Sequence, residues 1–239
     1  MLEANIPTAR PLEAYPSHDN SKKGTKYIAA NDLDDPGVRQ CLLDEIANRL
    51  YYWLHIGIPC TGWASMNQVN GGSRTQENPE GIVFLERERR ANMQALYVVE
   101  ICLALHAVGA FFSIENLVPS HLWICACFQK LKRMLDNHLY IVTFDQCAFK
   151  LTLPGAGPFE FCRKTTRIWT NMSELSRLER RCPGCGDFHQ HVHAVGNVTI
   201  AGVRHSRAAA AGRYPVELCQ ALADAGRAAW PLTPWTTPQ

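Results

Sequence analysis

Short apolar runs alternate along this chain with longer segments of helical periodicity, and this alternation restricts the fold more than any other feature. The expected strands are residues 26–30, 51–58, 110–114, 139–144 and 166–170. The expected helices are residues 36–50, 83–106 and 122–137, with a last one beginning at Pro215. Such alternation is typical of a mostly parallel sheet with helices on both faces. The sequence therefore predicts an α/β fold.

The predicted elements fall into four segments. Residues 1–25 are polar and rich in Pro, Ser and Lys, and they predict a disordered tail. Residues 26–175 predict the α/β core. Residues 176–213 are rich in Cys, His, Gly and Ala without a clear period, and they predict a small irregular lobe. Residues 214–230 predict a helix that returns to the core, with Pro215 suited to its first turn.

Charge and cysteine content narrow the class of protein. Residues 147–239 contain 11 basic and 6 acidic residues, although the whole chain has a formal net charge of +2, so we expect a polyanion such as DNA to meet this basic part. Ten cysteines without an export signal favour a reducing, intracellular compartment, cytoplasmic or nuclear. No apolar stretch reaches the roughly 20 residues of a membrane-spanning helix, so no membrane partner is expected.

Cys60 directly follows the second predicted strand, at the sheet edge where ligands bind in open α/β sheets. A thiol at that edge is accessible for reaction, and a nearby helix N-terminus or cation would favour its thiolate form. The alternative is that Cys60 is a small buried residue at a turn. Both interpretations remain open from this residue alone.

Glu115 follows the third predicted strand and would lie at the same edge. A carboxylate directly after mostly apolar residues is costly to bury unless it is paired or used. It could instead cap the following helix or pair with an arginine. Together, Cys60 and Glu115 at the ends of neighbouring strands indicate one site more strongly than either residue alone.

A series of short motifs resembles the DNA cytosine-5 methyltransferases, in particular phage-type DNA methylase-like proteins. The series is Pro59-Cys60, Glu115-Asn116, Asp145-Gln146-Cys147, Lys-Thr-Thr-Arg-Ile-Trp-Thr-Asn at 164–171, Cys-Pro-Gly-Cys at 182–185 with His189, and Arg-Tyr-Pro-Val-Glu-Leu-Cys at 213–219. The resemblance covers residues 31–225. It implies a Rossmann-like S-adenosylmethionine-dependent methyltransferase sheet, N-terminally truncated, with a small irregular C-terminal lobe.

The resemblance also implies a reaction, methyl transfer from S-adenosylmethionine to carbon 5 of a cytosine flipped out of DNA. Cys60 would add to carbon 6 of the ring, and Glu115 would hold ring nitrogen N3. Arg167 is the third implied catalytic residue. The residues implied to contact the base or the DNA backbone are Ser65, Asn116, Arg163 and Lys164. For residues 163–167 the alternative is a solvated charge run before a strand.

The start of the chain departs from the family pattern. The family opens with a strand and a Gly-rich turn for the methionine part of the cofactor, followed by an acidic residue for the ribose, and this sequence has neither. The resemblance assigns cofactor contacts to Asp32, Leu33 and Pro59, whereas the acids near Asp32 could equally cap a helix. A partner chain or an upstream domain is expected to supply the missing motif. The alternative function is a catalytically inactive DNA-binding relative or one subunit of a split methyltransferase.

The Cys/His-rich lobe suggests structural zinc, because zinc favours four thiolate and imidazole ligands in a tetrahedron. The preferred set is Cys182, Cys185, His189 and His193. The alternative is a polar loop with reduced cysteines and exposed histidines. A small zinc-stabilised α/β protein of unrelated function is a further interpretation of the whole chain.

Overall fold

The computed structural model describes residues 32–64, 68–69 and 71–230, and these divide into two units. Among the described residues, the N-terminal unit consists of 32–141 and Ile168–Ser173, and the C-terminal unit of Val142–Arg167 and Glu174–Trp230. The expected tail 1–25 and the expected strand 26–30 lie outside the described residues.

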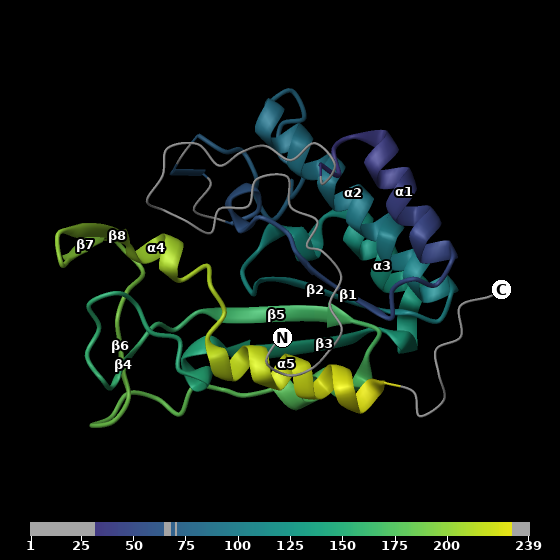
Figure 1. Cartoon of the computed structure of the whole chain (residues 1–239). Coiled ribbons are helices and arrows are strands. Elements are labelled where there is room, and N and C mark those ends of the chain that lie inside the picture. The colour runs from purple at the N-terminus through teal and green to yellow at the C-terminus, as the bar shows by residue number, and fades with distance from the viewer. Residues whose placement is uncertain (1–31, 65–67, 70, 231–239) are drawn as a thin grey trace. The chain divides into compact units, whose positions relative to one another are not determined.

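The helices of the N-terminal unit are α1 (Pro36–Ala47), α2 (Glu86–Ala107) and α3 (Ala126–Leu135), which lie side by side in Figure 1. Helix α1 begins as predicted. Pro36 suits a first turn, and the Asp35 side chain accepts hydrogen bonds from the backbone N–H groups of Gly37 and Val38. The expected helix 122–137 is instead divided into η5 (His121–Ile124) and α3, because Cys125 between them is extended (φ −66°, ψ 152°).

Four strands form one sheet in the order β1–β2–β5–β3. They are β1 (Trp53–Gly57), β2 (Phe111–Leu117), β3 (Tyr140–Asp145) and β5 (Thr165–Thr170). Strands β1 and β2 are parallel, and Gly57 lies opposite Glu115. The α/β class and a partly parallel sheet are therefore confirmed. Strand β2 extends beyond its expected end at residue 114, so Glu115 and Asn116 belong to the strand and not to the loop after it.

The hydrophobic core of the N-terminal unit involves one face of β2. Phe112 and Ile114 are fully buried, and they alternate along the strand with Ser113 and Glu115. The same core cluster includes residues from all three helices: Leu42, Ile46, Ala95, Leu105, Phe128 and Leu131. Full burial of a side chain of this size contributes roughly 1.5–3 kcal/mol. This packing holds β2 in place, and Ser113 and Glu115 lie on its other face.

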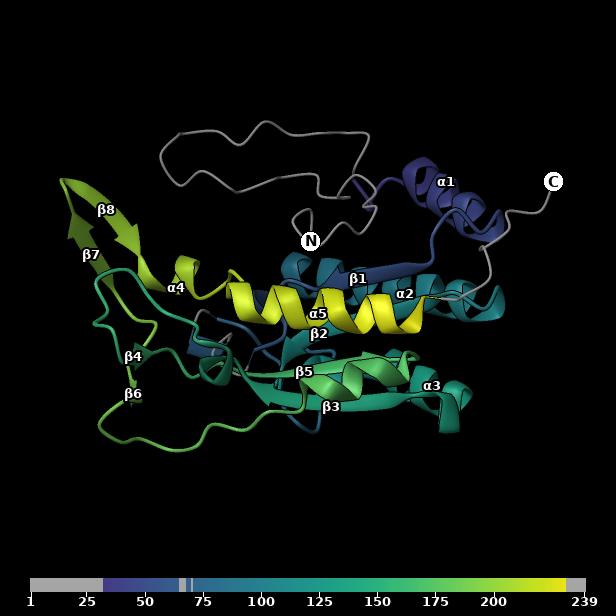
Figure 2. The same ribbon diagram turned by 60° about the horizontal axis from the view of Figure 1, so that its bottom comes forward.

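The C-terminal unit contains two small sheets. β4 (Glu160–Phe161) pairs in parallel with β6 (Gln190–His191), and β7 (Asn197–Ile200) forms an antiparallel hairpin with β8 (Val203–Ser206). Figure 2 shows this hairpin followed by the short helix α4 (Arg207–Ala210). The segment expected to be irregular therefore has regular structure. Its hairpin turn is formed by Ala201 and Gly202, both at positive φ, and Ala is an unusual residue for such a turn.

The last helix, α5 (Val216–Ala229), follows Pro215 as predicted. It packs against η7 (Gln146–Phe149), and beside this contact Lys150 pairs with Glu217 at 2.6 Å. No helix in the described ranges combines the length and the apolar character needed to cross a membrane.

Asn171, directly after β5, has a structural role in the sheet. Its side chain accepts a hydrogen bond from Phe112 N (2.8 Å) and donates one to Ala110 O (2.9 Å), so it holds the start of β2. The segment after it forms only the 3-10 helix η8 (Ser173–Leu178). The side chain serves a neighbouring strand because tertiary contacts bring that strand within reach.

Candidate functional site

Cys60 and Glu115 come from neighbouring parallel strands of the N-terminal unit. Gly57 ends β1 and is the register partner of Glu115, and paired strands lie about 4.8 Å apart. Cys60 begins η3 (Cys60–Gly62) just beyond Gly57, and its carbonyl accepts hydrogen bonds from Trp63 N (3.0 Å) and Ala64 N (2.8 Å). The Cys60 side chain is half-buried and Glu115 is 8% exposed. Neither residue is sealed inside the core cluster.

The segments that follow β1 and β2 are joined to each other. Three contacts make the connection: Asn116 Nδ2 donates to Ile58 O (3.0 Å), His121 N donates to Trp63 O (2.9 Å), and Ala64 pairs with Ser120 in an antiparallel bridge. These contacts hold the two strand ends together. The segments that carry Cys60 and Glu115 are therefore held in fixed positions relative to each other.

One face of β1 and β2 carries a row of polar side chains. Trp53, His55 and Gly57 alternate along β1, and Ser113 and Glu115 alternate along β2. The Ser113 hydroxyl accepts a hydrogen bond from Trp53 Nε1 (2.8 Å) and contacts His55 Nδ1 (2.8 Å). Burial lowers the pKa of the half-buried His55 ring to about 4, so the ring is neutral at pH 7. Glu115 therefore shares its face of the sheet with neutral polar groups.

Gly57 leaves open space beside Glu115. A Cβ added at Gly57 would meet no described heavy atom within 4 Å. Because Gly57 and Glu115 are register partners, this space lies beside residue 115 on the same face of the sheet. The motifs of the sequence did not point to Gly57, His55 or Ser113, although their alternation along the two strands is the signal that would have found them.

The segment after Cys60 is anchored to α2 by two buried charged residues, Arg74 and Glu88. The Arg74 guanidinium lies 3.7 Å from the centroid of the Trp63 ring, and its Nη2 donates to Asn92 Oδ1 at 2.9 Å. The Glu88 carboxylate accepts hydrogen bonds from Ser73 N (2.7 Å), Ser73 Oγ (2.5 Å) and Ile82 N (2.8 Å). Sequence reasoning missed both residues because their partners are distant in the chain.

The residues expected to bind S-adenosylmethionine have structural contacts of their own. The Asp32 carboxylate accepts a hydrogen bond from Asp34 N (3.0 Å), and Leu33 packs against the core cluster. Pro59 directly precedes η3. The capping alternative is confirmed for Asp35, the N-cap of α1. Ser65, expected to contact DNA, lies outside the described residues.

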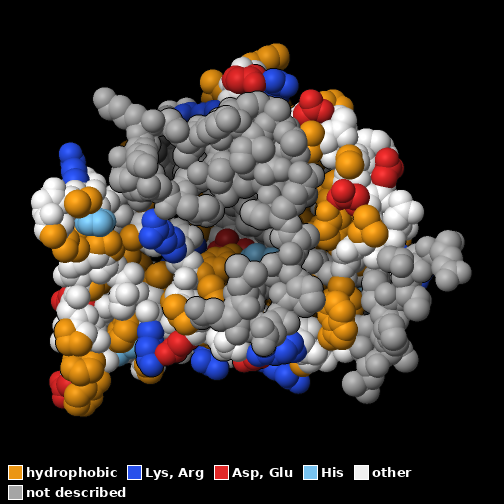
Figure 3. All heavy atoms as spheres, in the orientation of Figure 1, with side chains coloured by type: hydrophobic (Ala, Val, Ile, Leu, Met, Phe, Trp, Pro, Cys, Tyr) orange, Lys and Arg blue, Asp and Glu red, His pale blue; other side chains and the backbone are white. Residues whose placement is uncertain are grey.

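The basic residues expected to contact DNA belong to the C-terminal unit. Arg163 is mostly exposed, with its Nε 3.5 Å from Asp145 Oδ1, and Arg167 is half-buried in β5. Burial, with a smaller effect from Arg181, lowers the pKa of Arg167. The β7–β8 hairpin of the same unit, at the left of Figure 3, carries exposed hydrophobic side chains, and Val203 there is 53% exposed.

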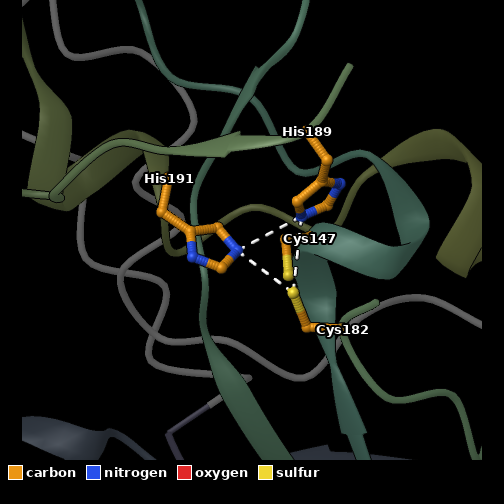
Figure 4. A group of neighbouring side chains, drawn as sticks. All are labelled: Cys147, Cys182, His189 and His191. Carbon is orange, nitrogen blue, oxygen red and sulfur yellow. Dashed lines mark hydrogen bonds between the residues drawn. The ribbon is translucent and has the colours of Figure 1, made fainter. Parts of the chain in front are cut away.

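Four side chains of the C-terminal unit form a group that could hold a metal ion: Cys147, Cys182, His189 and His191. Their ligand atoms all lie within 4.8 Å of one another, and Figure 4 shows the four side chains pointing toward a common centre. Cys182 and His189 belong to the expected zinc set. Cys147 and His191 take the places expected for Cys185 and His193, because η7 brings Cys147 to the group from a distant part of the chain.

Several residues support this Cys/His group. Asp145 is 1% exposed, and its carboxylate accepts hydrogen bonds from Cys182 N (3.0 Å) and Thr165 Oγ1 (2.5 Å). Burial opposes ionisation of Asp145, but these bonds and the nearby Arg163 outweigh it and hold its pKa below the usual value. Burial, aided by the Cys182 thiol, raises the pKa of Cys147 to about 12. A bound cation would reverse that effect, because it stabilises the thiolate.

The fold and these groups define a mixed α/β protein with a partly parallel sheet and a Cys/His cluster that could hold a metal. No protein-family model, curated protein or solved structure matches the chain.

Proposed function

We propose that this chain is a DNA (cytosine-5) methyltransferase-like protein whose N-terminal unit binds a flipped cytosine between Cys60 and Glu115. The observation that carries the proposal is the pairing of Gly57 with Glu115, together with the hydrogen bond from Asn116 to Ile58 O. These contacts hold the thiol and the carboxylate at the same end of two adjacent strands. The order of the motifs around these residues supports the same reaction.

The proposed chemistry uses the two side chains in complementary ways. The Cys60 thiolate adds to carbon 6 of the cytosine, and the electron pair of the C5–C6 double bond moves toward the ring carbonyl and N3. Glu115, protonated before the attack, donates its proton to N3 and so neutralises the negative charge that develops there. Carbon 5 thereby becomes nucleophilic. After carbon 5 is methylated, N3 returns its proton to Glu115 and carbon 5 loses its proton to water. The electron pair left on carbon 5 restores the double bond as the Cys60–carbon bond breaks and frees the thiolate.

The flipped base would occupy the open space at Gly57. A planar ring that enters beside Glu115 meets no side chain from the register partner of that residue. His55 is neutral at pH 7 and adds no charge to this face, so the proposal has a protonated Glu115 carboxyl donate to the lone pair of ring nitrogen N3. This environment favours hydrogen bonding to a polar ring.

The proposal includes two cofactors and two partners. S-adenosylmethionine supplies the methyl group when bound, with Asp32, Leu33 and Pro59 as its contacts in this chain. A partner chain or an upstream domain supplies the Gly-rich turn that binds its methionine part. Zinc is the proposed structural metal of the Cys/His group. DNA is the substrate, and Arg163, Lys164 and Arg167 are its proposed contacts in the C-terminal unit.

The proposal is tested by trapping the covalent step without methyl transfer. A library of DNA duplexes that contain 5-azacytosine is incubated with the full chain, because the extra ring nitrogen makes carbon 6 more electrophilic. We expect a protein–DNA adduct that survives a denaturing gel. Cys60→Ser removes the adduct, and Glu115→Gln slows its formation by about 100-fold.

Cys41→Ser is the matched control, because Cys41 is an exposed cysteine on α1 of the same unit. Its adduct should form at the wild-type rate. An adduct that persists in Cys60→Ser, or that disappears in Cys41→Ser, contradicts the proposal. DNA binding with steep salt dependence but no adduct in the wild type would favour the catalytically inactive relative instead.

A further inference from the structure

The segment from residue 181 to residue 210 has ordered secondary structure but no buried side chain. The structure describes this whole segment, and none of its side chains is buried, although it contains β6, β7, β8 and α4. Phe188 is 74% exposed and Val195 is 72% exposed. Hydrophobic burial therefore contributes little to holding this segment, and small folds of this kind are commonly stabilised by a metal or by disulfides.

The geometry of the Cys/His group matches a tetrahedral zinc ion. With Zn–S near 2.3 Å and Zn–N near 2.0 Å, tetrahedral angles place a sulfur about 3.5 Å from a nitrogen and two nitrogens about 3.3 Å apart. In the protein, Cys182 Sγ lies 3.5 Å from His189 Nε2 and 3.2 Å from His191 Nε2. The two histidine Nε2 atoms lie 3.2 Å apart. These three separations are close to those of ligands around one ion, and Cys147 Sγ lies within 4.8 Å of the other three ligand atoms.

The ligands reach the group from three places in the C-terminal unit. Cys147 lies in η7, directly after β3, and is 1% exposed. Cys182 follows the segment whose Arg180 O accepts a hydrogen bond from Asp145 N (2.9 Å). His189 and His191 are two residues apart around β6, so they lie on one face of an extended chain.

We propose that Cys147, Cys182, His189 and His191 bind one Zn²⁺ ion in a closed structural site that holds residues 181–210 to η7. Two thiolates and two imidazoles fill all four tetrahedral positions, which leaves no open position for catalysis. Asp145 is a positioning residue, because it fixes the backbone of Cys182. Cys185 lies 3.4 Å from His191 Nδ1, on the side of the ring opposite the Nε2 that faces the ion, so it is not a ligand.

Zinc content is measured by elemental analysis of the full chain and of single variants. We expect about one zinc per chain in the wild type. Cys147→Ser and His191→Ala should lose stoichiometric zinc. Cys185→Ser and His193→Ala are matched controls that should keep it, because they alter a neighbouring cysteine and histidine that the proposed site does not use. Cys162→Ser controls for the loss of a buried thiol in the same unit.

A second measurement uses the wild-type chain, so it does not depend on whether the variants fold. Co²⁺ is added to the metal-free wild-type chain, and tetrahedral coordination with thiolate ligands gives a distinctive visible spectrum. Removal of zinc by a chelator should increase proteolytic cleavage within residues 181–210, and added zinc should restore protection. Asp145→Asn should weaken zinc binding by about 10- to 100-fold, in the range known for residues that orient metal ligands.

The proposal is overturned if the wild type binds no zinc, or if Cys185→Ser and His193→Ala lose zinc as fully as Cys147→Ser. It deepens the zinc part of the proposed function, and its test is separate from the test of methyl transfer. Cys60→Ser should keep its zinc even though it forms no DNA adduct, so a failure of either proposal is recognised separately.

Discussion

Asn116 Nδ2 donates a hydrogen bond to Ile58 O across 3.0 Å, and this bond connects β2 to the segment that carries Cys60. Asn116 Oδ1 also accepts a hydrogen bond from Leu117 N (2.9 Å). Asn116 is 1% exposed, so water has little access to replace these bonds. The side chain therefore satisfies two backbone groups where β1 and β2 end.

Asn116→Ala should destabilise the protein, because it leaves Ile58 O and Leu117 N without their partner. An unsatisfied buried group costs about 1–3 kcal/mol, so we expect the free energy of unfolding to fall by about 2–4 kcal/mol in urea titration. Asn48→Ala removes an exposed side-chain bond to Asp44 O and should cost less than about 0.5 kcal/mol. An equal loss of unfolding free energy in the two variants would show that Asn116 does not connect the ends of β1 and β2.

Gly57→Leu should block the proposed base pocket without unfolding the protein. The position is exposed, and an added Cβ meets no described atom within 4 Å, so we expect the free energy of unfolding to change by less than about 1 kcal/mol. The rate of adduct formation with 5-azacytosine DNA should fall at least about tenfold, whereas Gly57→Ala should retain more activity because its side chain is smaller. A wild-type rate in Gly57→Leu would exclude this space as the pocket.

Glu88→Ala should be among the more destabilising single substitutions in the N-terminal unit. It removes the acceptor of three hydrogen bonds from Ser73 and Ile82, at a residue that is 0% exposed. We expect a loss of about 3–5 kcal/mol in thermal or urea unfolding.

The matched control for Glu88→Ala is Glu86→Ala, two residues earlier on the same helix. Glu86 is exposed and pairs with Arg89 on the helix surface, so its loss should cost much less than the loss of Glu88. Comparable losses at both positions would mean that Glu88 does not anchor the segment after Cys60.

His55 should make the protein less stable as the pH falls from 6.5 toward 4. Burial lowers its pKa to about 4 in the folded chain, whereas an unperturbed histidine has a pKa of 6.5. Between these values the unfolded chain binds the extra proton and the folded chain does not, so stability falls with falling pH. From pH 7 to pH 4.5 the wild type should lose on the order of 2 kcal/mol more than His55→Gln, measured by urea unfolding at each pH. Parallel pH profiles for the two proteins would contradict this assignment.

The regular elements were predictable where the signal is local. Helix α1 follows from Pro36 and the capping Asp35, and β1 follows from an apolar run before Pro59. The β7–β8 hairpin was not predicted, because its short strands carry mostly exposed side chains and its turn contains Ala201. The role of Asn171 was also not predicted, because its partners in β2 are distant in sequence.

The amino-acid sequence alone established the α/β class and the presence of a thiol, a carboxylate and a Cys/His-rich segment, because periodicity and residue type are properties of neighbouring residues. Tertiary packing was needed to establish that Gly57 lies opposite Glu115 and that Cys147 and His191 complete the Cys/His group. Register and ligand choice depend on which distant segments pack together. Cys185 is closer in sequence to Cys182 than Cys147 is, yet the fold of η7 brings Cys147 into the group.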